Sequence, residues 1–362
     1  MLSKKQLSIL LFVLILFDCK LSYAMDIQQF DIDASAINSA ISGNLPINFD
    51  FERLIDMVLK GGIEDIIDYV FSAIKSDFAN TLGDHKKIMS TLLPLVFLSS
   101  CQNLLFQDDF MFVSRLVNIS AAGFLCATYI VLYTLASNTI GGILNFLKSA
   151  LPVFLGFSAA ISIKSTYLNT VFIFSLTVFQ WLCENILLPG ITFAAVLSIV
   201  DSFNDSLNFA NIKSSIISAV NWTIGIYSTL FIGALKIVQI TVFSSDRLLY
   251  GGIRYTISRG IPVVGSYVSE SLGAVLSGVI TLYNSVGIAV VIIILLIVLV
   301  PVVSIFLVSW LLKFISGFAG TFAHQSCTNL IGDIGLCISE LGIVLLVCSV
   351  GFIVAFSLML TH

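Results

Sequence analysis

The chain has 362 residues, of which 58% are hydrophobic and only 10% are charged, and its mean hydropathy is +1.05. Soluble domains carry about 25% charged residues, and a soluble fold of this length has too little interior to bury so much apolar surface. With 17 Lys and Arg against 21 Asp and Glu, the chain lacks the basic surface that nucleic-acid-binding proteins need. The composition excludes a cytosolic enzyme and a disordered regulator, and it predicts an all-α, polytopic α-helical membrane protein.

The cysteines and histidines give no sign of a disulfide framework or a metal site. The seven cysteines are an odd number, lie mainly in apolar runs and form no C-x-x-C pair, and the three histidines are scattered. Cysteines in such surroundings behave as small buried hydrophobes. We therefore expect buried thiols, and neither a metal ion nor another cofactor.

The N-terminus has the features of a secretory signal. Lys4 and Lys5 precede the apolar run Leu7–Phe17, and Ser22 and Ala24 are small residues at the spacing that signal peptidase requires. This run is too short to cross about 30 Å of hydrocarbon as a helix. Residues 1–24 are therefore predicted to be a cleavable signal peptide, with an uncleaved signal anchor as the alternative.

Residues 25–86 are predicted to form an acidic, helical, extracytoplasmic head. The stretch Met25–Asp84 holds 11 acidic and three basic residues. Apolar residues recur at helical spacing from Phe51 to Leu59 and from Ile63 to Phe78, with Gly61 and Gly62 between them. We expect a helical hairpin that packs on the membrane domain or lies at the interface, and a docking face for a partner is the alternative.

Residues 87–362 are predicted to form a multi-pass membrane domain of about seven to eight helices. Long stretches without charge mark its spans. Pro189–Val200 is expected to be a broken or re-entrant piece, Ser271–Ser285 a weaker Gly-rich helix, and Pro301 a kink. The seven predicted spans are Ile88–Phe106, Leu116–Ser137, Gly141–Ile163, Ser165–Leu188, Ile216–Leu235, Val286–Leu312 and Ile334–Leu360.

The distribution of basic residues predicts the orientation. Arg247, Arg254 and Arg259 lie in the predicted loop Ser244–Pro262, which the positive-inside rule places in the cytoplasm. With the head outside, the acidic loop Asp201–Asn211 also falls outside. Two basic residues oppose this orientation, Lys86 and Lys87.

Two carboxylates within the predicted spans, Glu184 and Glu340, are the candidate functional side chains. Such a residue is a candidate ion or proton site by default. The alternatives place Glu184 near the membrane surface at a helix break and Glu340 one turn into its span. No Walker A loop or nucleophile elbow is present, so neither a self-contained enzyme nor an ATP-driven pump is expected. Small residues also recur at four-residue spacing, a pattern of close helix packing: Gly123 with Ala127, Gly156 with Ala160, Gly273 with Ser277, and Ser285 with Ala289.

Two motifs in the C-terminal half resemble the stage III sporulation protein AE family of endospore-forming bacteria. The first is the turn IPVVG, with Pro262 and Gly265, and the second is the sequence NSVGI, with Asn284 and Gly287. The chain departs from the family pattern "IPVVGG…SDA" followed by "KNAVGI" in three places: Ser266 replaces the second Gly, Glu270 replaces Asp, and Tyr283 replaces Lys.

The resemblance implies a multi-pass subunit of the mother-cell membrane, within a channel or secretion-like complex that connects mother cell and forespore. It also implies a hetero-oligomer with other stage III sporulation proteins, with the acidic head facing the space between the two membranes. An autonomous secondary transporter that uses Glu184 as its coupling site is the second hypothesis.

Overall fold

A computed structural model describes the backbone of residues 111–161, 163–203, 209–260, 265–321 and 325–360, besides Ser90, Thr91, Pro94 and Phe97. Within these ranges, side chains are described for residues 116–150, 171–203, 209–237, 286–321 and 325–356. The predicted signal peptide, the acidic head and most of the span Ile88–Phe106 lie outside the described residues.

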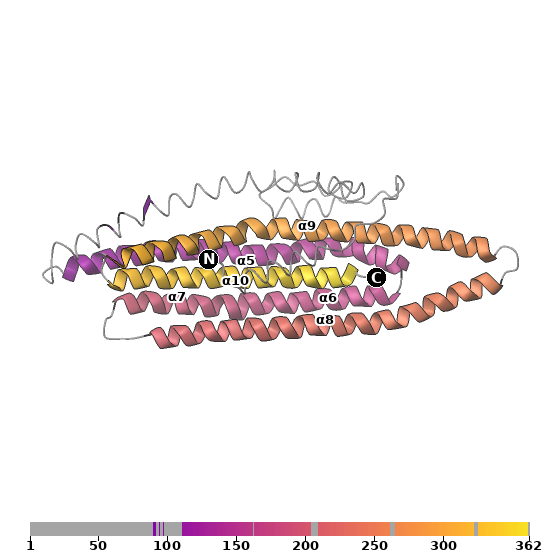
Figure 1. The fold of residues 1–362 in the computed structure, drawn as a ribbon, viewed down its shortest axis with the longest axis horizontal. Coiled ribbons are helices and arrows are strands. Elements are labelled where there is room, and N and C mark those ends of the chain that lie inside the picture. The colour runs from indigo at the N-terminus through magenta and orange to yellow at the C-terminus, as the bar shows by residue number, and fades with distance from the viewer. Residues whose placement is uncertain are drawn as a thin grey trace.

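Every element of this described part is a helix, and the long axes of the helices run in nearly the same direction (Figure 1). The predicted all-α architecture is confirmed. In chain order the helices are α5 (Met111–Ile161), α6 (Ile163–Leu182), the π-helical turn η1 (Cys183–Leu187), α7 (Leu188–Phe203), α8 (Ala210–Gly260), α9 (Gly265–Ala319) and α10 (Gln325–Leu360).

Helix α5 is one continuous helix where the sequence predicted two spans, Leu116–Ser137 and Gly141–Ile163. The polar residues between these spans do not form a loop, because a hydroxyl group in a helix can donate to a backbone carbonyl of the preceding turn. Thr139 Oγ1 donates to the Leu135 carbonyl, four residues back, at 2.7 Å. The break in hydropathy is therefore not a break in the backbone.

The region predicted as a cytoplasmic loop, Ser244–Pro262, is helical up to Gly260 and belongs to α8. Helix α9 likewise continues without a break through Asn284 and through Pro301. As a result, α8 and α9 form a helical hairpin that extends beyond the ends of α6 and α10 (Figure 1). We call the parts of this hairpin at residues 238–260 and 265–285 the arm.

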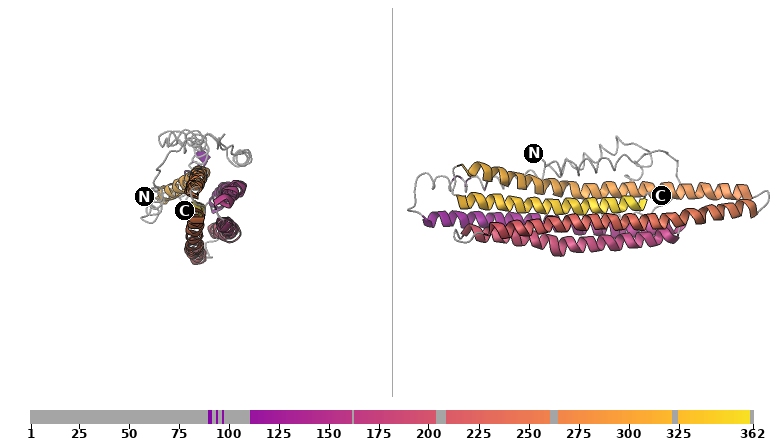
Figure 2. Two further views of the ribbon diagram at one scale, coloured as in Figure 1. Left: turned by 90° about the vertical axis from the view of Figure 1, so that its right-hand side faces the viewer. Right: turned by 60° about the horizontal axis from the view of Figure 1, so that its bottom comes forward.

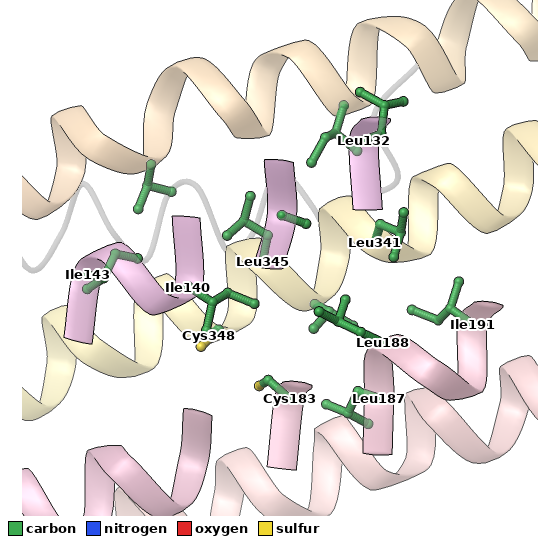
Figure 3. Packing of buried hydrophobic residues seen from close by; sticks show 14 of the residues in the cluster. Leu132, Ile140, Ile143, Cys183, Leu187, Leu188, Ile191, Leu341, Leu345 and Cys348 are labelled. Carbon is green, nitrogen blue, oxygen red and sulfur yellow. The ribbon is translucent and has the colours of Figure 1, made fainter. Parts of the chain in front are cut away.

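Helix α10 lies at the centre of the bundle and packs against α5, α6, α7, α8 and α9 (Figure 2). It begins at Gln325, nine residues before the predicted span. In its most apolar window 61% of the residues are buried, whereas in α8 only 17% are buried. Figure 3 shows the core around α10, where Leu341 and Leu345 meet α5 residues such as Ile140 and α7 residues such as Leu188. Helix α8 is therefore peripheral.

Small residues bring α9 and α10 into close contact. A β-carbon at Gly332 would lie 2.8 Å from Ser316 Oγ, and one at Gly342 would lie 3.1 Å from the Phe306 ring. Ser309 Oγ donates to the Gly335 carbonyl at 2.7 Å, so a side chain on one helix bonds to the backbone of the other. This is the packing that small residues permit in lipid.

The predicted close-packing pair Gly123 and Ala127 is not part of such a contact. Both residues are exposed, and no atom lies within 4 Å of a β-carbon built on Gly123. Four-residue spacing alone did not identify the contact between α9 and α10, because it does not indicate which face of a helix meets a neighbour.

An aromatic cluster joins α6, α8 and α10. The buried ring of Phe179 stacks on Tyr227 and Phe231 of α8, with centroid distances of 5.2 and 4.9 Å. Phe352 of α10 meets the Phe179 ring edge-on at 6.3 Å. A β-carbon at the adjacent Gly351 would lie only 2.7 Å from Phe179 Cε1, so glycine is required for this contact.

Candidate functional site

A polar cleft with a volume of about 590 Å³ lies where the C-terminal part of α7 meets the N-terminal parts of α8 and α10. This end of the bundle is opposite to the arm (Figure 1). Hydroxyl, amide and carboxylate groups make up most of the cleft lining, and serines are the most frequent residue. The polar lining residues are Ser198, Asp201, Ser202, Lys213, Ser214, Ser218, Ser326, Asn329, Asp333 and Glu340.

A lysine bridges two aspartates in this cleft. Lys213 Nζ donates to Asp201 Oδ2 at 2.9 Å and also to Asp333 Oδ2. The other oxygen of Asp201, Oδ1, accepts the backbone N–H of Phe209 at 3.0 Å. The Lys213 side chain is 10% exposed, whereas those of Asp201 and Asp333 are 23% and 32% exposed. We call these three residues the ion-pair triad.

The helix ends explain how the ion-pair triad assembles. Asp201 lies in the last turn of α7 and Lys213 in the first turn of α8, so a short connection brings them together. Asp333 is distant in sequence and lies two turns into α10. The triad therefore connects three helices at one end of the bundle, and two lysine–carboxylate pairs replace the hydration that its charges lose on burial.

Glu340 lies at the inner end of the same cleft, two turns beyond Asp333 along α10. It faces Asn221 of α8 and Lys313 of α9. Its Oε2 atom is buried and has no hydrogen-bond partner. Because α10 begins at Gln325, Glu340 lies about four turns into the helix rather than one turn. One oxygen of its carboxylate is thus unsatisfied, while the residue as a whole is partly buried.

Glu184 lies in the π-helical turn η1, near the middle of the continuous α6–η1–α7 helix. Its Oε1 accepts a hydrogen bond from Gln180 Nε2 at 2.8 Å, and it faces Gly141 of α5. A π-helical turn inside a helix frequently marks a functional site. Glu184 therefore lies within a continuous helix and not at one of its ends.

The predicted re-entrant piece Pro189–Val200 is instead regular helix in α7. Proline lacks a backbone N–H, so Pro189 cannot bond to the carbonyl one turn earlier. The chain accommodates it with a wider turn, in which the Leu188 N–H donates to the Cys183 carbonyl five residues back. The prediction for this piece was wrong, because the irregularity lies just before Pro189, in η1, and the helix widens there and does not break.

The remaining candidate residues do not gather at the cleft. Gly265 is the first residue of α9, and Asn284 and Gly287 lie within that helix, Gly287 buried. Pro262 lies outside the described residues. The arginines of the predicted loop, Arg247, Arg254 and Arg259, lie on the helical arm, at the end of the bundle opposite to the cleft.

Sequence reasoning missed the ion-pair triad. It treated Asp201 as a loop charge and did not single out Lys213 or Asp333. A detectable signal was present, because each of these charges interrupts or borders an apolar segment. The contact itself joins Lys213 and Asp333, which are 120 positions apart, and no local sequence pattern indicates such a contact.

Five described helical segments are long and apolar enough to cross a membrane, which defines a multi-pass α-helical membrane protein. The spans are Leu116–Ala150, Val171–Phe203, Ala210–Ile237, Val286–Ala319 and Gln325–Phe356.

The chain belongs to the stage III sporulation protein AE family, whose model matches residues 49–362. The resemblance noted in the two C-terminal motifs is thereby confirmed, and a role in sporulation follows. Stage III sporulation protein AE of Bacillus subtilis (strain 168) is 21% identical over 198 residues, which cover 51% of this chain and 50% of that relative. The match thus spans about half the length of the relative. No solved structure matches the chain.

Proposed function

We propose that this protein is a membrane subunit of the channel or secretion-like complex that links mother cell and forespore, and that forespore development requires it. Its partners would be other stage III sporulation proteins in the mother-cell membrane. Membership of the sporulation family carries this proposal. The geometry of α8 supports it, because a subunit needs surfaces that its own fold leaves uncovered.

The outward face of α8 is such a surface. Trp222, Leu230 and Ile237 are 72%, 65% and 67% exposed, and Gly225 and Gly233 have no atom within 4 Å of a built β-carbon. Small residues on an exposed face allow another helix to approach closely in lipid. This face therefore permits the close approach of a helix from a neighbouring subunit.

Crosslinking in sporulating cells, followed by purification and mass spectrometry of the recovered proteins, tests this proposal. Other stage III sporulation proteins should be recovered with the wild-type protein, and Gly225→Leu should reduce that recovery. Gly123→Leu is the matched control, because Gly123 is an equally open glycine on α5. Recovery of no other stage III protein with the wild-type chain would contradict the proposal.

We propose further that the arm lies in the cytoplasm, since Arg247, Arg254 and Arg259 are the densest basic cluster of the chain after the signal. The ends of α7 and α8 at the cleft would then face the space outside the mother-cell cytoplasm. The acidic head lies on the same side of the membrane as the cleft if the chain does not cross the membrane before α5. It lies on the same side as the arm if Ile88–Phe106 is a span. Protease protection of the head and the arm in sealed vesicles distinguishes these arrangements.

An autonomous secondary transporter is the second candidate function, and Glu184 in its π-helical turn is the observation that favours it. On this hypothesis the purified protein alone transports a solute in liposomes, and Glu184→Gln abolishes the transport. The subunit hypothesis expects no transport by the isolated protein.

A further inference from the structure

A line of polar side chains runs along the outward face of α5. Its members are separated by four, seven and three residues, a spacing that keeps them on one side of a helix. All of them are exposed, whereas the buried residues of the same stretch lie on the opposite side. They are Thr134, Asn138, Asn145 and Lys148.

A carboxylate and an amide from the neighbouring helix occupy the gap between Asn138 and Asn145. A β-carbon at Gly141 would lie 3.7 Å from Glu184 Oε1 and 3.8 Å from Gln180 Nε2. Gln180 Nε2 also donates to Glu184 Oε1 at 2.8 Å. We call the six polar residues of this face the polar stripe: Thr134, Asn138, Asn145, Lys148, Gln180 and Glu184.

The polar stripe lies at the depth of the most apolar part of the bundle. Phe179, the neighbour of Gln180 in the chain, packs against Gly351 of α10. Residues 341–360 of α10 contain no Asp, Glu, Lys or Arg, and neither do residues 271–312 of α9. From its first to its last residue on α5 the stripe measures about 21 Å, which is about two-thirds of the roughly 30 Å hydrocarbon layer.

Lipid chains satisfy only some of these side chains. Thr134 Oγ1 donates to carbonyls of its own helix, and the long stem of Lys148 can reach towards the membrane surface. The side chains of Asn138 and Asn145 are short, and each carries two N–H donors and a carbonyl acceptor. Exposed amides at this depth need water or another polar chain beside them.

Direct contact with a second copy of the chain fits the stripe poorly. Copies in one membrane share their orientation, so a two-fold axis along the membrane normal brings identical residues together at the same depth. Lys148 would then face Lys148 and Glu184 would face Glu184, and like charges repel most strongly in a low-dielectric layer. Water between the chains removes this repulsion and also solvates the amides.

We propose that the polar stripe lines a water-filled passage across the membrane in the assembled complex, with Glu184 and Lys148 as the charged groups of its wall. Rings of polar and charged side chains line aqueous pores in this way. One carboxylate and one ammonium group per chain leave the wall without net charge, so it admits polar solutes of either sign. The proposal rests on the function proposed above and specifies which face of the subunit meets the passage.

Thiol labelling in membranes from sporulating cells, opened to the reagent on both sides, tests the proposal. Mass spectrometry measures how fast a membrane-impermeant methanethiosulfonate modifies the new thiol of Asn138→Cys or Asn145→Cys in the full chain. Leu230→Cys is the matched control, because Leu230 is 65% exposed and its neighbour Phe231 stacks on Phe179, which places it at a similar depth on α8. Both stripe variants should react about a hundredfold faster than this control, since the reactive thiolate forms in water and is suppressed in apolar surroundings.

A rate for Asn138→Cys or Asn145→Cys no higher than that of the control would overturn the proposal, because lipid or a neighbouring helix would then cover the stripe. Both positions are exposed, so these substitutions leave the core intact. Slow labelling together with recovery of other stage III proteins in the crosslinking experiment would remove only the pore-lining face and leave the subunit function standing. Fast labelling without that recovery would support the passage and contradict membership of the complex.

Discussion

Replacement of Gly351 by alanine should destabilise the junction between α6, α8 and α10. A β-carbon at Gly351 would lie 2.7 Å from Phe179 Cε1, closer than two non-bonded carbons can approach. The Phe179 ring cannot retreat, because Tyr227 and Phe231 stack on it and Phe352 meets it edge-on. Overpacking costs about 1–3 kcal/mol and Gly→Ala in a helix gains about 0.5–1 kcal/mol, so the expected net loss is about 1 kcal/mol at the middle of these ranges and about 2.5 kcal/mol at most.

Thermal unfolding of the purified protein in detergent measures this loss, which corresponds to a melting temperature lower by about 1–3 °C in a chain of this size. Gly123→Ala is the control, since its new methyl group meets no atom within 4 Å. In a Phe179→Leu background the cost of Gly351→Ala should shrink, because the ring that it strikes is gone. Equal melting temperatures for Gly351→Ala and Gly123→Ala would refute the packing argument.

Three other perturbations test separate features. Lys213→Met should lower the free energy of unfolding by about 2 kcal/mol in the same assay. This is less than the roughly 3–5 kcal/mol expected for a fully buried pair, because the side chains of Asp201 and Asp333 are 23% and 32% exposed. An unchanged melting temperature would mean that water already solvates the triad. Single cysteines that replace Asp205 or Val263 in a cysteine-free background should react with a membrane-impermeant thiol reagent from opposite sides of sealed vesicles, because α8 lies between them in the chain. Reaction of both cysteines from the same side would disprove that α8 crosses the membrane. Ser309→Ala should cost about 1 kcal/mol, since it removes the bond from α9 to the α10 backbone, whereas Thr134→Ala on the exposed face of α5 should cost less.

Among the described residues, hydropathy identified apolar segments that overlap the five candidate spans, but it could not show where helices end. The stretch from Ser137 to Gly141 has the polar and glycine residues of a turn, yet it lies inside α5. Thr139 bonds to its own helix, and Gly141 packs against Glu184 of η1, where a β-carbon would lie 3.7 Å from Oε1. The same residue types thus occur both in turns and at contacts between helices. Only knowledge of the neighbouring helix shows which of the two a given stretch forms.

The functional site was predictable only in part. Glu340 stood out because a carboxylate within an apolar segment is rare, and the structure places it at the inner end of the polar cleft. Lys213 and Asp333 did not stand out, because each lies near a helix end, where charges are ordinary. Their importance comes from a contact between α8 and α10, and tertiary contacts of that kind leave no periodic pattern in the sequence.

The length of α8 has a mechanical consequence. The helix begins beside the ion-pair triad and ends at the tip of the arm, and its 51 residues measure about 75 Å at 1.5 Å per residue. A tilt of about 5° at the triad would therefore move the tip by about 6–7 Å, a geometric result of that length. Helix α8 thus has the geometry of a lever, because a small rotation at the triad corresponds to a displacement of several ångströms at the tip of the arm.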